Sequence, residues 1–300
     1  MKGKLAKKNE RTAYIFCIPW YIGFLAFTIV PIVYMLYFSL TDRKLNGLSE
    51  FIGFKNYQNI FSSSVFWNSL RVTLFYTLVS VVVTAIWALF LALLLNKKQK
   101  LQGAFQFFYF IPSVIPSVAL AYSFRTIFGK DSGLLNGILS NFAGKSVSVN
   151  WLYNPQTVYF AVFAVTLFTY STGQMMMIFR NGLNVVPKEL YESAELDGAN
   201  AVSKFFHVTL PMISPIFLFN IITSVIGALN GSFALLFPLA SENGDPNGMT
   251  QVLSLLIYKE SFSNMRVGYA SALSFILFVV AALIGIIIFA LSKKFVYYEN

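Results

Sequence analysis

Long apolar runs with almost no charged residue are the feature that most constrains the fold of this chain. Only 11% of its 300 residues are charged and 57% are apolar, whereas a soluble domain has about 25% charged residues. A helix of about 20 such residues crosses the hydrocarbon core of a bilayer. A membrane β-barrel would instead show alternating segments of about ten residues. The pattern therefore predicts an all-α, polytopic membrane protein.

Six runs are long enough to cross a bilayer, and they predict one membrane domain over residues 13–292 with short tails at 1–12 and 293–300. The first run is too long for the apolar part of a cleavable signal peptide, which has about 7 to 15 residues. We therefore interpret it as a retained span. The six predicted spans are residues 13–40, 70–95, 105–128, 158–179, 216–239 and 269–291.

The distribution of positive charge predicts the orientation of these spans. Ten of the 22 Lys and Arg residues lie in the N-terminal tail, in the loop after the second span and in the C-terminal tail, and loops rich in Lys and Arg stay in the cytoplasm. Both termini are therefore expected to be cytoplasmic. The net charge of +10 is explained in this way, and we expect no nucleic-acid partner. Three longer loops, residues 41–69, 129–157 and 240–268, then face outward.

The segment between the fourth and fifth spans has the composition of a soluble protein. It includes "ELYESAELDGANAVSKFFHVTLP", residues 189–211. Pro187 suits the start of a helix, and Glu189 and Glu192 complement a positive helix N-terminus. Gly198 suits a left-handed stop about three turns later. The segment 187–211 is predicted to form a helix, a turn and a second helix on the cytoplasmic side.

No catalytic site is indicated by the sequence. Glu192, Glu195 and Asp197 have no second His or Cys near them, and the lone His207 stands among apolar residues, which favours packing. "GKS" at residues 144–146 lacks the first glycine of a phosphate-binding loop, because Leu139 stands there. The single cysteine excludes a Cys-based metal site. We predict a chain that is not an enzyme and holds no metal or cofactor.

Polar residues inside three predicted spans indicate a passage, because polar side chains avoid lipid and face a bundle interior or a cavity. Residues four apart share a helix face, which predicts one polar stripe in the third span and another in the fourth. Neutral polar groups among aromatic rings suit a sugar. The alternative is that such small residues only allow close helix packing. The residues are Ser113 and Ser117; Thr166, Tyr170, Ser171 and Gln174; and Thr223, Gly227, Asn230 and Ser232.

The segment 187–211 resembles the cytoplasmic "EAA" loop of binding-protein-dependent ABC importers, whose pattern is Glu-Ala-Ala, three residues, Gly, nine residues and Ile-x-Leu-Pro. Two positions depart from that pattern, since Ser193 replaces the first Ala and Val208 replaces Ile. The likeness extends over nearly the whole chain to one permease subunit of carbohydrate importers of the maltose and glycerol-phosphate type. It includes "GFKNYQNIF" at 53–61, "SGLLNGIL" at 132–139 and "GYASALSFILF" at 268–278.

The resemblance implies a type I ABC importer permease in a bacterial cytoplasmic membrane. The partners that it implies are a second, homologous permease, ATPase subunits that bind ATP and Mg²⁺, an extracellular solute-binding protein and membrane lipid. It also implies that the loop docks on the ATPase through Glu192, Ala194, Gly198, Leu210 and Pro211. Contacts with a carbohydrate are implied for Ser113, Ser117, Ser171, Gln174, Asn230 and Ser232, beside Tyr170 of the polar stripe.

Three other functions were weighed. An importer of glycerol phosphate would need Arg or Lys in the passage, and only Arg71, Arg125 and Arg180 lie near span ends. An ion-coupled carrier would need buried charge pairs, and none is apparent. A membrane-embedded enzyme would need clustered acids or a Ser–base pair at membrane depth. The sequence therefore favours a carbohydrate importer.

Overall fold

The computed structural model describes residues 2–47, 49–96, 102–241 and 243–295, and within these ranges the regular structure is helical. Four segments are long and apolar enough to cross a bilayer, and a fifth is obtained if a bent pair of helices counts as one span. The predicted all-α membrane class is confirmed to this extent. The four segments are Tyr14–Ser39, Ser64–Asn96, Ser214–Leu239 and Val267–Lys293.

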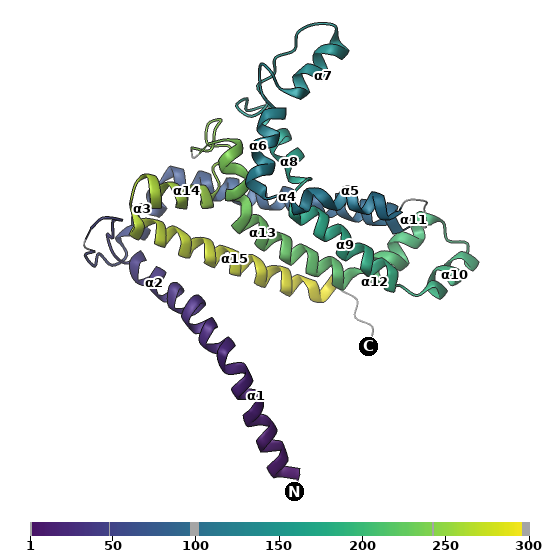
Figure 1. Ribbon diagram of the computed structural model, residues 1–300, viewed down its shortest axis with the longest axis horizontal. Helices are drawn as coiled ribbons and strands as arrows, with labels where there is room; N and C mark the ends of the chain where they lie inside the picture. Colours follow the sequence, from purple (N-terminus) through teal and green to yellow (C-terminus); the bar gives the residue numbers. More distant parts are fainter. Residues whose placement is uncertain (1, 48, 97–101, 242, 296–300) are drawn as a thin grey trace. The chain divides into compact units, whose positions relative to one another are not determined.

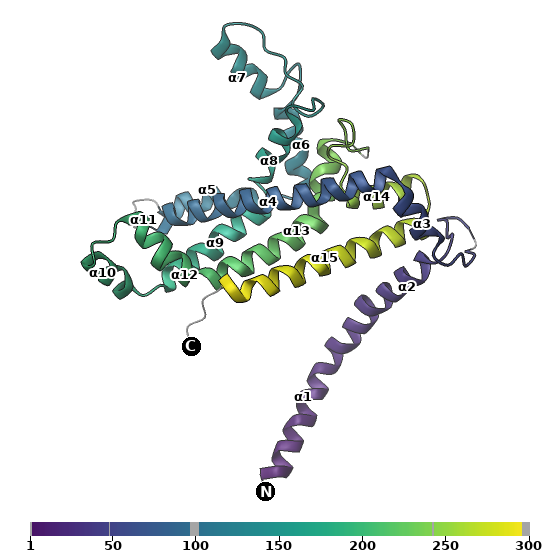
Figure 2. The same ribbon diagram turned by 180° about the vertical axis from the view of Figure 1, so that it is seen from behind.

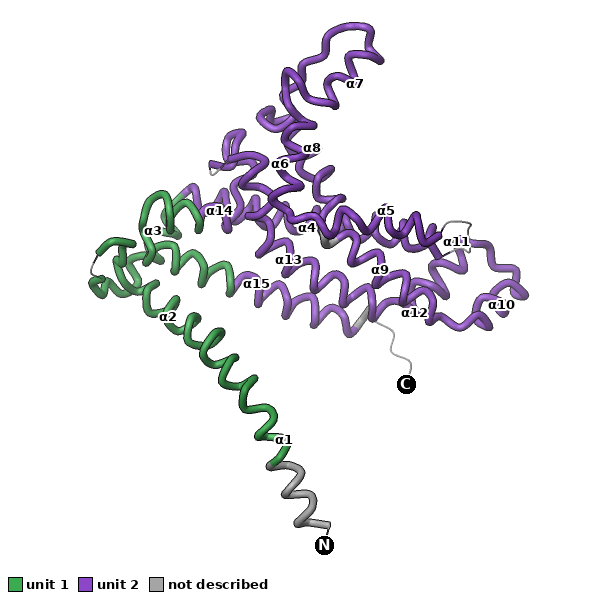
Figure 3. Tube along the Cα trace, in the orientation of Figure 1, with its two compact units in different colours: residues 1–63, 257–278 green, residues 64–256, 279–300 purple. Residues whose placement is uncertain are grey.

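The chain divides into two compact units (Figure 3), residues 1–63 with 257–278 and residues 64–256 with 279–300. The single domain predicted over residues 13–292 stays a prediction. The first unit contains one nearly continuous helical run followed by a short helix. Its elements are α1 (Lys2–Phe24), the π-helix η1 (Leu25–Ile29), α2 (Val30–Ser39), α3 (Lys55–Ser62), the π-helix η3 (Lys259–Ser263) and the first part of α15 (Val267–Phe295).

Asn56 holds the loop that follows α2. Its buried side-chain amide donates hydrogen bonds of 2.8 Å to the backbone oxygens of Ser39 and Thr41. The backbone groups at the end of a helix have no partner within the helix, and Asn56 supplies one. Thr41 also forms an antiparallel bridge with Phe51. The sequence phrase "GFKNYQNIF" is thus partly explained by the turn that it stabilises.

The second unit is a helical bundle in which the predicted third and fourth spans are not straight helices (Figures 1 and 2). α5 and α6 are bent by 99°, and α8 ends at Thr166, four residues before α9 begins. The predicted continuous helix over 158–179 is therefore wrong. The helices of this unit are α4 (Ser64–Asn96), α5 (Gln102–Val114), α6 (Ser117–Ile127), α7 (Leu134–Ala143), α8 (Val158–Thr166), α9 (Tyr170–Val185), α10 (Lys188–Leu196), α11 (Ala201–Lys204), the π-helix η2 (Phe205–Thr209), α12 (Leu210–Met212), α13 (Ser214–Leu239), most of α14 (Leu253–Tyr258) and the end of α15.

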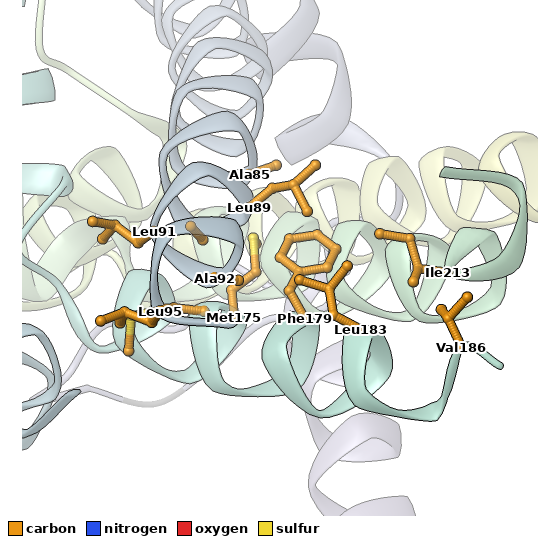
Figure 4. Packing of buried hydrophobic residues seen from close by; sticks show 12 residues of the cluster. Ala85, Leu89, Leu91, Ala92, Leu95, Met175, Phe179, Leu183, Val186 and Ile213 are labelled. Carbon is orange, nitrogen blue, oxygen red and sulfur yellow. The ribbon is translucent and has the colours of Figure 1, made fainter. Parts of the chain in front are cut away.

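α4 and α9 form the best-packed part of the second unit (Figure 4). Small residues of α4, such as Ala88 and Ala92, lie against Met176 and Phe179 of α9, and all four side chains are completely buried. Lipid tails are as apolar as these side chains, so close van der Waals packing rather than escape from water holds helices together in a bilayer. The alanines allow that close approach, and the pair provides a rigid wall beside the polar features described next.

Candidate functional site

A polar chamber lies between α4, α6, α8 and α13 of the second unit. Its volume is about 190 Å³. None of the described residues that line it is charged, and its polar groups are hydroxyls. α4 supplies three of them at intervals of four residues, which places them on one helix face. The chamber is lined by Tyr76, Ser80, Val81, Thr84, Ser117, Thr166, Thr169, Ser224, Ala228, Gly231 and Leu235.

The bend between α5 and α6 places Ser117 in the chamber. Pro112 and Pro116 lack the N–H groups that would continue the helical hydrogen bonds, and Pro116 adopts extended backbone angles, φ −55° and ψ 133°. α6 therefore begins at Ser117 in a new direction. Irregular backbone at membrane depth is tolerated where it is buried in protein or lines a cavity, and here it lines the chamber.

The break between α8 and α9 is stabilised by threonines. Thr169 has extended angles, φ −79° and ψ 166°, and the backbone oxygen of Thr166 accepts a hydrogen bond of 3.1 Å from the Thr169 N–H. The hydroxyls of Thr169 and Thr172 donate to the same oxygen at 2.7 and 3.3 Å. These additional hydrogen bonds stabilise the gap. Thr166 and Thr169 reach the chamber because the helix is interrupted between them.

Residues 187–211, which we call the elbow, have the predicted helix, turn and helix. Pro187 precedes α10, and Gly198 has a left-handed φ of +78°. Asn200 caps α11 by accepting a hydrogen bond of 2.9 Å from the Ser203 N–H. The Tyr191 hydroxyl lies 3.0 Å from that of Thr209, so the two arms of the elbow are tied to each other.

The tip of the elbow exposes apolar side chains. Leu196 is 90% exposed and Leu190 is 40% exposed, although both lie on a short helix that also carries exposed Glu192. The Lys204 ammonium lies 3.2 Å from the Glu195 carboxylate, but such an exposed pair contributes little to stability. An exposed apolar tip on a tied, well-capped element is typical of a surface that binds another protein.

A family model described as "Binding-protein-dependent transport system inner membrane component" matches residues 84–297, which include the elbow and the chamber residues from Thr84 onward. The chain belongs to this family. It is a family of transport components, and the predicted class of ABC transporter permease is confirmed by its relatives. The chain is 34% identical to the "Probable ABC transporter permease protein YesP" of Bacillus subtilis, over 100% of this chain and 96% of the relative.

Other relatives of this permease carry the names of sugars. It is 32% identical to the "Arabinooligosaccharides transport system permease protein AraP" of Bacillus subtilis, over 96% of this chain and 90% of the relative. It is 32% identical to the "Trehalose/maltose transport system permease protein MalF" of Thermococcus litoralis, over 93% of this chain and 92% of the relative.

Solved structures show the fold of the permease. One chain of a "bacterial alginate ABC transporter in complex with alginate pentasaccharide-bound periplasmic protein" matches with a TM-score of 0.84 and 22% identity, over 98% of both chains. At this identity the likeness concerns the fold alone. The predicted fold of a type I ABC importer permease is therefore confirmed.

Two predicted polar stripes do not exist in the permease. Ser113 lies in α5 and Ser117 in α6, so the 99° bend places them on separate helices. Thr166 likewise lies in α8, whereas Tyr170 and Gln174 lie in α9. Both expectations were wrong because the intervals of four residues assumed continuous helices. The side chains of Tyr170 and Ser171 lie outside the described part of the structure.

Among the predicted carbohydrate contacts whose side chains the structure describes, only Ser117 lines the chamber. Ser113 is buried beside Gly173, where an added Cβ would lie 2.7 Å from the Ser113 Cβ, so this serine lies at a close crossing of α5 and α9. Ser232 is buried and its hydroxyl lies 3.0 Å from that of Ser254. Asn230 is exposed on α13, and Gln174 lines a smaller cavity nearby. Contact with a carbohydrate stays a prediction for all of them.

The predicted ATPase-docking residues lie along the elbow. Glu192 and Gly198 are exposed and Ala194 is half-buried, all at or near α10. Leu210 and Pro211 are half-buried in α12, where they line an apolar groove of about 480 Å³ with Phe206 and Phe217. The structure thus groups these residues on one element, and their role in docking stays a prediction.

The hydroxyls of α4 were missed in the sequence. Tyr76, Ser80 and Thr84 contribute to the chamber, yet they lie in a strongly apolar span. Their spacing of four residues was a visible signal, equal to the one used for other spans. Several apolar helices could turn such a face toward a common cavity. The packing of the helices decides which of them do so, and one sequence does not specify that packing.

Proposed function

We propose that this chain is a membrane subunit of an ATP-driven importer that moves a carbohydrate, an oligosaccharide or glycoside, through the chamber. The observation that carries the proposal is the uncharged, hydroxyl-lined chamber with Tyr76 in its wall. Sugar hydroxyls need donors and acceptors, and the apolar faces of sugar rings pack on aromatic rings. Relatives named for arabino-oligosaccharides, trehalose, maltose and lactose support this substrate class.

The size of the chamber fits a shared passage. Pockets for small ligands usually have about 300 to 1,000 Å³, and this chamber has about 190 Å³. One sugar unit at a time would therefore contact this subunit. A second, homologous permease supplies the opposite wall, and a solute-binding protein delivers the carbohydrate to the outer loops.

The proposed topology has six spans with both termini in the cytoplasm of a bacterial cell. α1, η1 and α2 form the first span, and α4 forms the second. The bent pair α5 and α6 forms the third, and the interrupted pair α8 and α9 forms the fourth. α13 and α15 complete the set, and the positively charged tails and the loop after α4 lie on the cytoplasmic side.

ATP supplies the energy through the elbow. The exposed side chains of Leu190 and Leu196 enter a cleft of a partner ATPase, which binds the ATP and Mg²⁺. Movement of that subunit shifts α10 to α12 and, with them, the start of α13. The chamber then opens alternately to the two sides of the membrane, and this chain itself performs no hydrolysis.

The rival substrates have less support. A phosphate would need a cation in the chamber, and no lining residue in the described part of the chain is charged. Arg125 lies at the end of α6, where it donates hydrogen bonds of 3.3 and 3.4 Å to the Pro238 carbonyl and the Tyr153 hydroxyl. It is already engaged in holding α6 to the neighbouring segments.

Uptake by the complete importer tests the proposal. The chain, its second permease, its ATPase and its binding protein are reconstituted in liposomes that contain ATP. Labelled trehalose, maltose, lactose and arabinotriose are offered, with glycerol 3-phosphate as the rival. ATP-dependent uptake of at least one saccharide is expected. Uptake of glycerol 3-phosphate alone, or saccharide uptake by liposomes that contain only this chain and no ATPase, would overturn the proposal.

A further inference from the structure

Asn220 of α13 has a side-chain nitrogen without a hydrogen-bond partner. The residue is 1% exposed, and its Nδ2 is one of three buried side-chain atoms in the described part of the chain that lack a partner. An amide N–H group that is removed from water without a new partner destabilises the conformation that buries it. A packed apolar side chain would stabilise this conformation more than the unpaired amide does. The amide is therefore expected to have its hydrogen-bond partner in another conformation of the protein.

Asn220 lies at a second cavity, which we call the inner cavity. Its volume is about 120 Å³, enough for a few water molecules, each of which takes about 30 Å³ in the liquid. The residues that line it come from α9 and α13 alone. They are Gln174, Met175, Ile178, Asn220, Thr223, Ser224 and Gly227.

The inner cavity continues the chamber toward the elbow. Ser224 lines both spaces, and Asn220 lies one helical turn before it on α13. α13 runs from Ser214, next to α12, to Leu239, so the step from the chamber to Asn220 leads toward the elbow. Figures 1 and 2 show α9 and α13 running together in that direction as far as α12.

A packed contact closes the path beyond the inner cavity. The rings of Phe179 and Phe217 lie 5.5 Å apart, and Phe179 is completely buried. One turn further along α9, Gly182 packs so closely against Ile216 that even a methyl group there would collide with its side chain. The unpaired amide therefore lies just inside a seal between α9 and α13.

We propose that Asn220, with Gln174 and Thr223, is an inner binding site for a saccharide hydroxyl, which the carbohydrate reaches from the chamber when α9 and α13 separate. The inference rests on the proposed function and extends it to the exit of the substrate. The amide is unpaired while the seal is closed, and it gains a hydroxyl partner as the seal opens. The closed conformation is thereby disfavoured relative to the conformation that releases the sugar.

The test compares two substitutions that each remove a buried, unpaired polar atom. Asn220→Leu keeps the size of the side chain and removes its amide. Thr77→Val removes the hydroxyl of Thr77, which is buried and unpaired but lines neither cavity. Both variants are assembled into the complete importer, and the saccharide that the unmodified importer accepts is used as the probe.

We expect Asn220→Leu to lower the maximal rate of uptake about fivefold to tenfold, as the loss of one hydrogen bond implies. Two other quantities should stay the same, namely the external saccharide concentration for half-maximal uptake and the ATPase rate stimulated by the binding protein. The thermal unfolding temperature should stay the same or rise. Thr77→Val should transport normally. A purely structural role would instead lower stability, ATPase rate and uptake together.

Three results would overturn the inference. Normal uptake by Asn220→Leu in an importer that moves the saccharide overturns it alone, as does a loss of uptake that follows a matching loss of folded protein. Absence of saccharide uptake by the unmodified importer overturns both this inference and the proposed function.

Discussion

The elbow and the chamber are built in opposite ways. The elbow is one continuous segment, residues 187–211, with an exposed tip where Leu196 is 90% exposed. The chamber gathers hydroxyls from four helices that are far apart in the sequence, such as Tyr76 on α4 and Ser224 on α13. A contiguous surface suits a protein partner, whereas a dispersed lining can change shape when helices move. The two regions should therefore respond differently to substitution.

The largest effect is expected at the turn of the elbow. Gly198 has a φ of +78°, a conformation that costs most residues with a side chain about 1 to 2 kcal/mol but that Asn and Asp adopt more readily. Gly198→Asp therefore acts mainly through the negative charge that it adds to the elbow. Gly198→Asp should abolish ATP-driven uptake, while the chain still reaches the membrane. Uptake and the membrane content of the chain are measured together.

Gly198→Asn is the matched control, because no other group lies within 4 Å of an added Cβ at this position. It should keep much of the uptake. Normal transport by Gly198→Asp would contradict the role of the elbow.

The next largest effect is expected inside the chamber. An added side chain at Gly231 would enter open space, so Gly231→Phe should fill the chamber without disturbing the fold. If moving the ring aside to admit the saccharide costs about 1 to 3 kcal/mol, saccharide uptake should fall by about fivefold to 150-fold. Initial rates of uptake measure this.

Gly285→Phe provides the comparison, since Gly285 of α15 also faces open space but does not line the chamber. Equal loss of uptake in both variants would show that bulk alone, rather than a blocked chamber, explains the result.

A smaller effect is expected for the hydroxyls of α4. Tyr76→Phe and Ser80→Ala each remove one hydroxyl from the chamber wall, and one hydrogen bond is worth about 1 kcal/mol. Uptake at low saccharide concentration should fall about fivefold in each variant. ATP hydrolysis without saccharide should not change, and a change there would indicate altered packing instead.

The smallest effect is expected for Ser232, although the sequence placed it in the passage. Its hydroxyl lies against that of Ser254, away from the chamber. Ser232→Ala should leave uptake within about twofold of normal and lower the free energy of unfolding by about 1 kcal/mol. Thermal unfolding of the purified complex, read beside uptake, separates the two. A selective loss of uptake would place Ser232 in the passage after all.

The same contrast explains how much could be predicted from the sequence. The elbow is encoded locally, because Pro187, Gly198 and Asn200 specify a helix start, a left-handed turn and a cap from adjacent positions. The long apolar runs likewise predicted the membrane class and four of the helical segments. These features depend on neighbours in the sequence, so one sequence is enough to find them.

The chamber depends on interactions that are not local. Ser113 and Ser117 were predicted to share one face, but the bend at Pro112 and Pro116 places them on separate helices. No proline or glycine in the sequence marks the gap after Thr166. The break is stabilised instead by the hydroxyls of Thr169 and Thr172. Both errors placed polar residues on the wrong helix face. The hydroxyls of α4 were overlooked because the sequence does not show which helices pack against α4.

Cross-linking from the tip of the elbow tests the central claim most directly. Cys17 is the only cysteine, so Cys17→Ser provides a background for Leu196→Cys, with Leu134→Cys, on exposed α7, as the control. In the assembled importer, a photoreactive group on residue 196 is expected to form a cross-link to the ATPase, and the yield of this cross-link should change when ATP is added. The same group on residue 134 should form no cross-link to the ATPase. Failure of residue 196 to reach any partner protein in an importer that still transports saccharide would contradict the account.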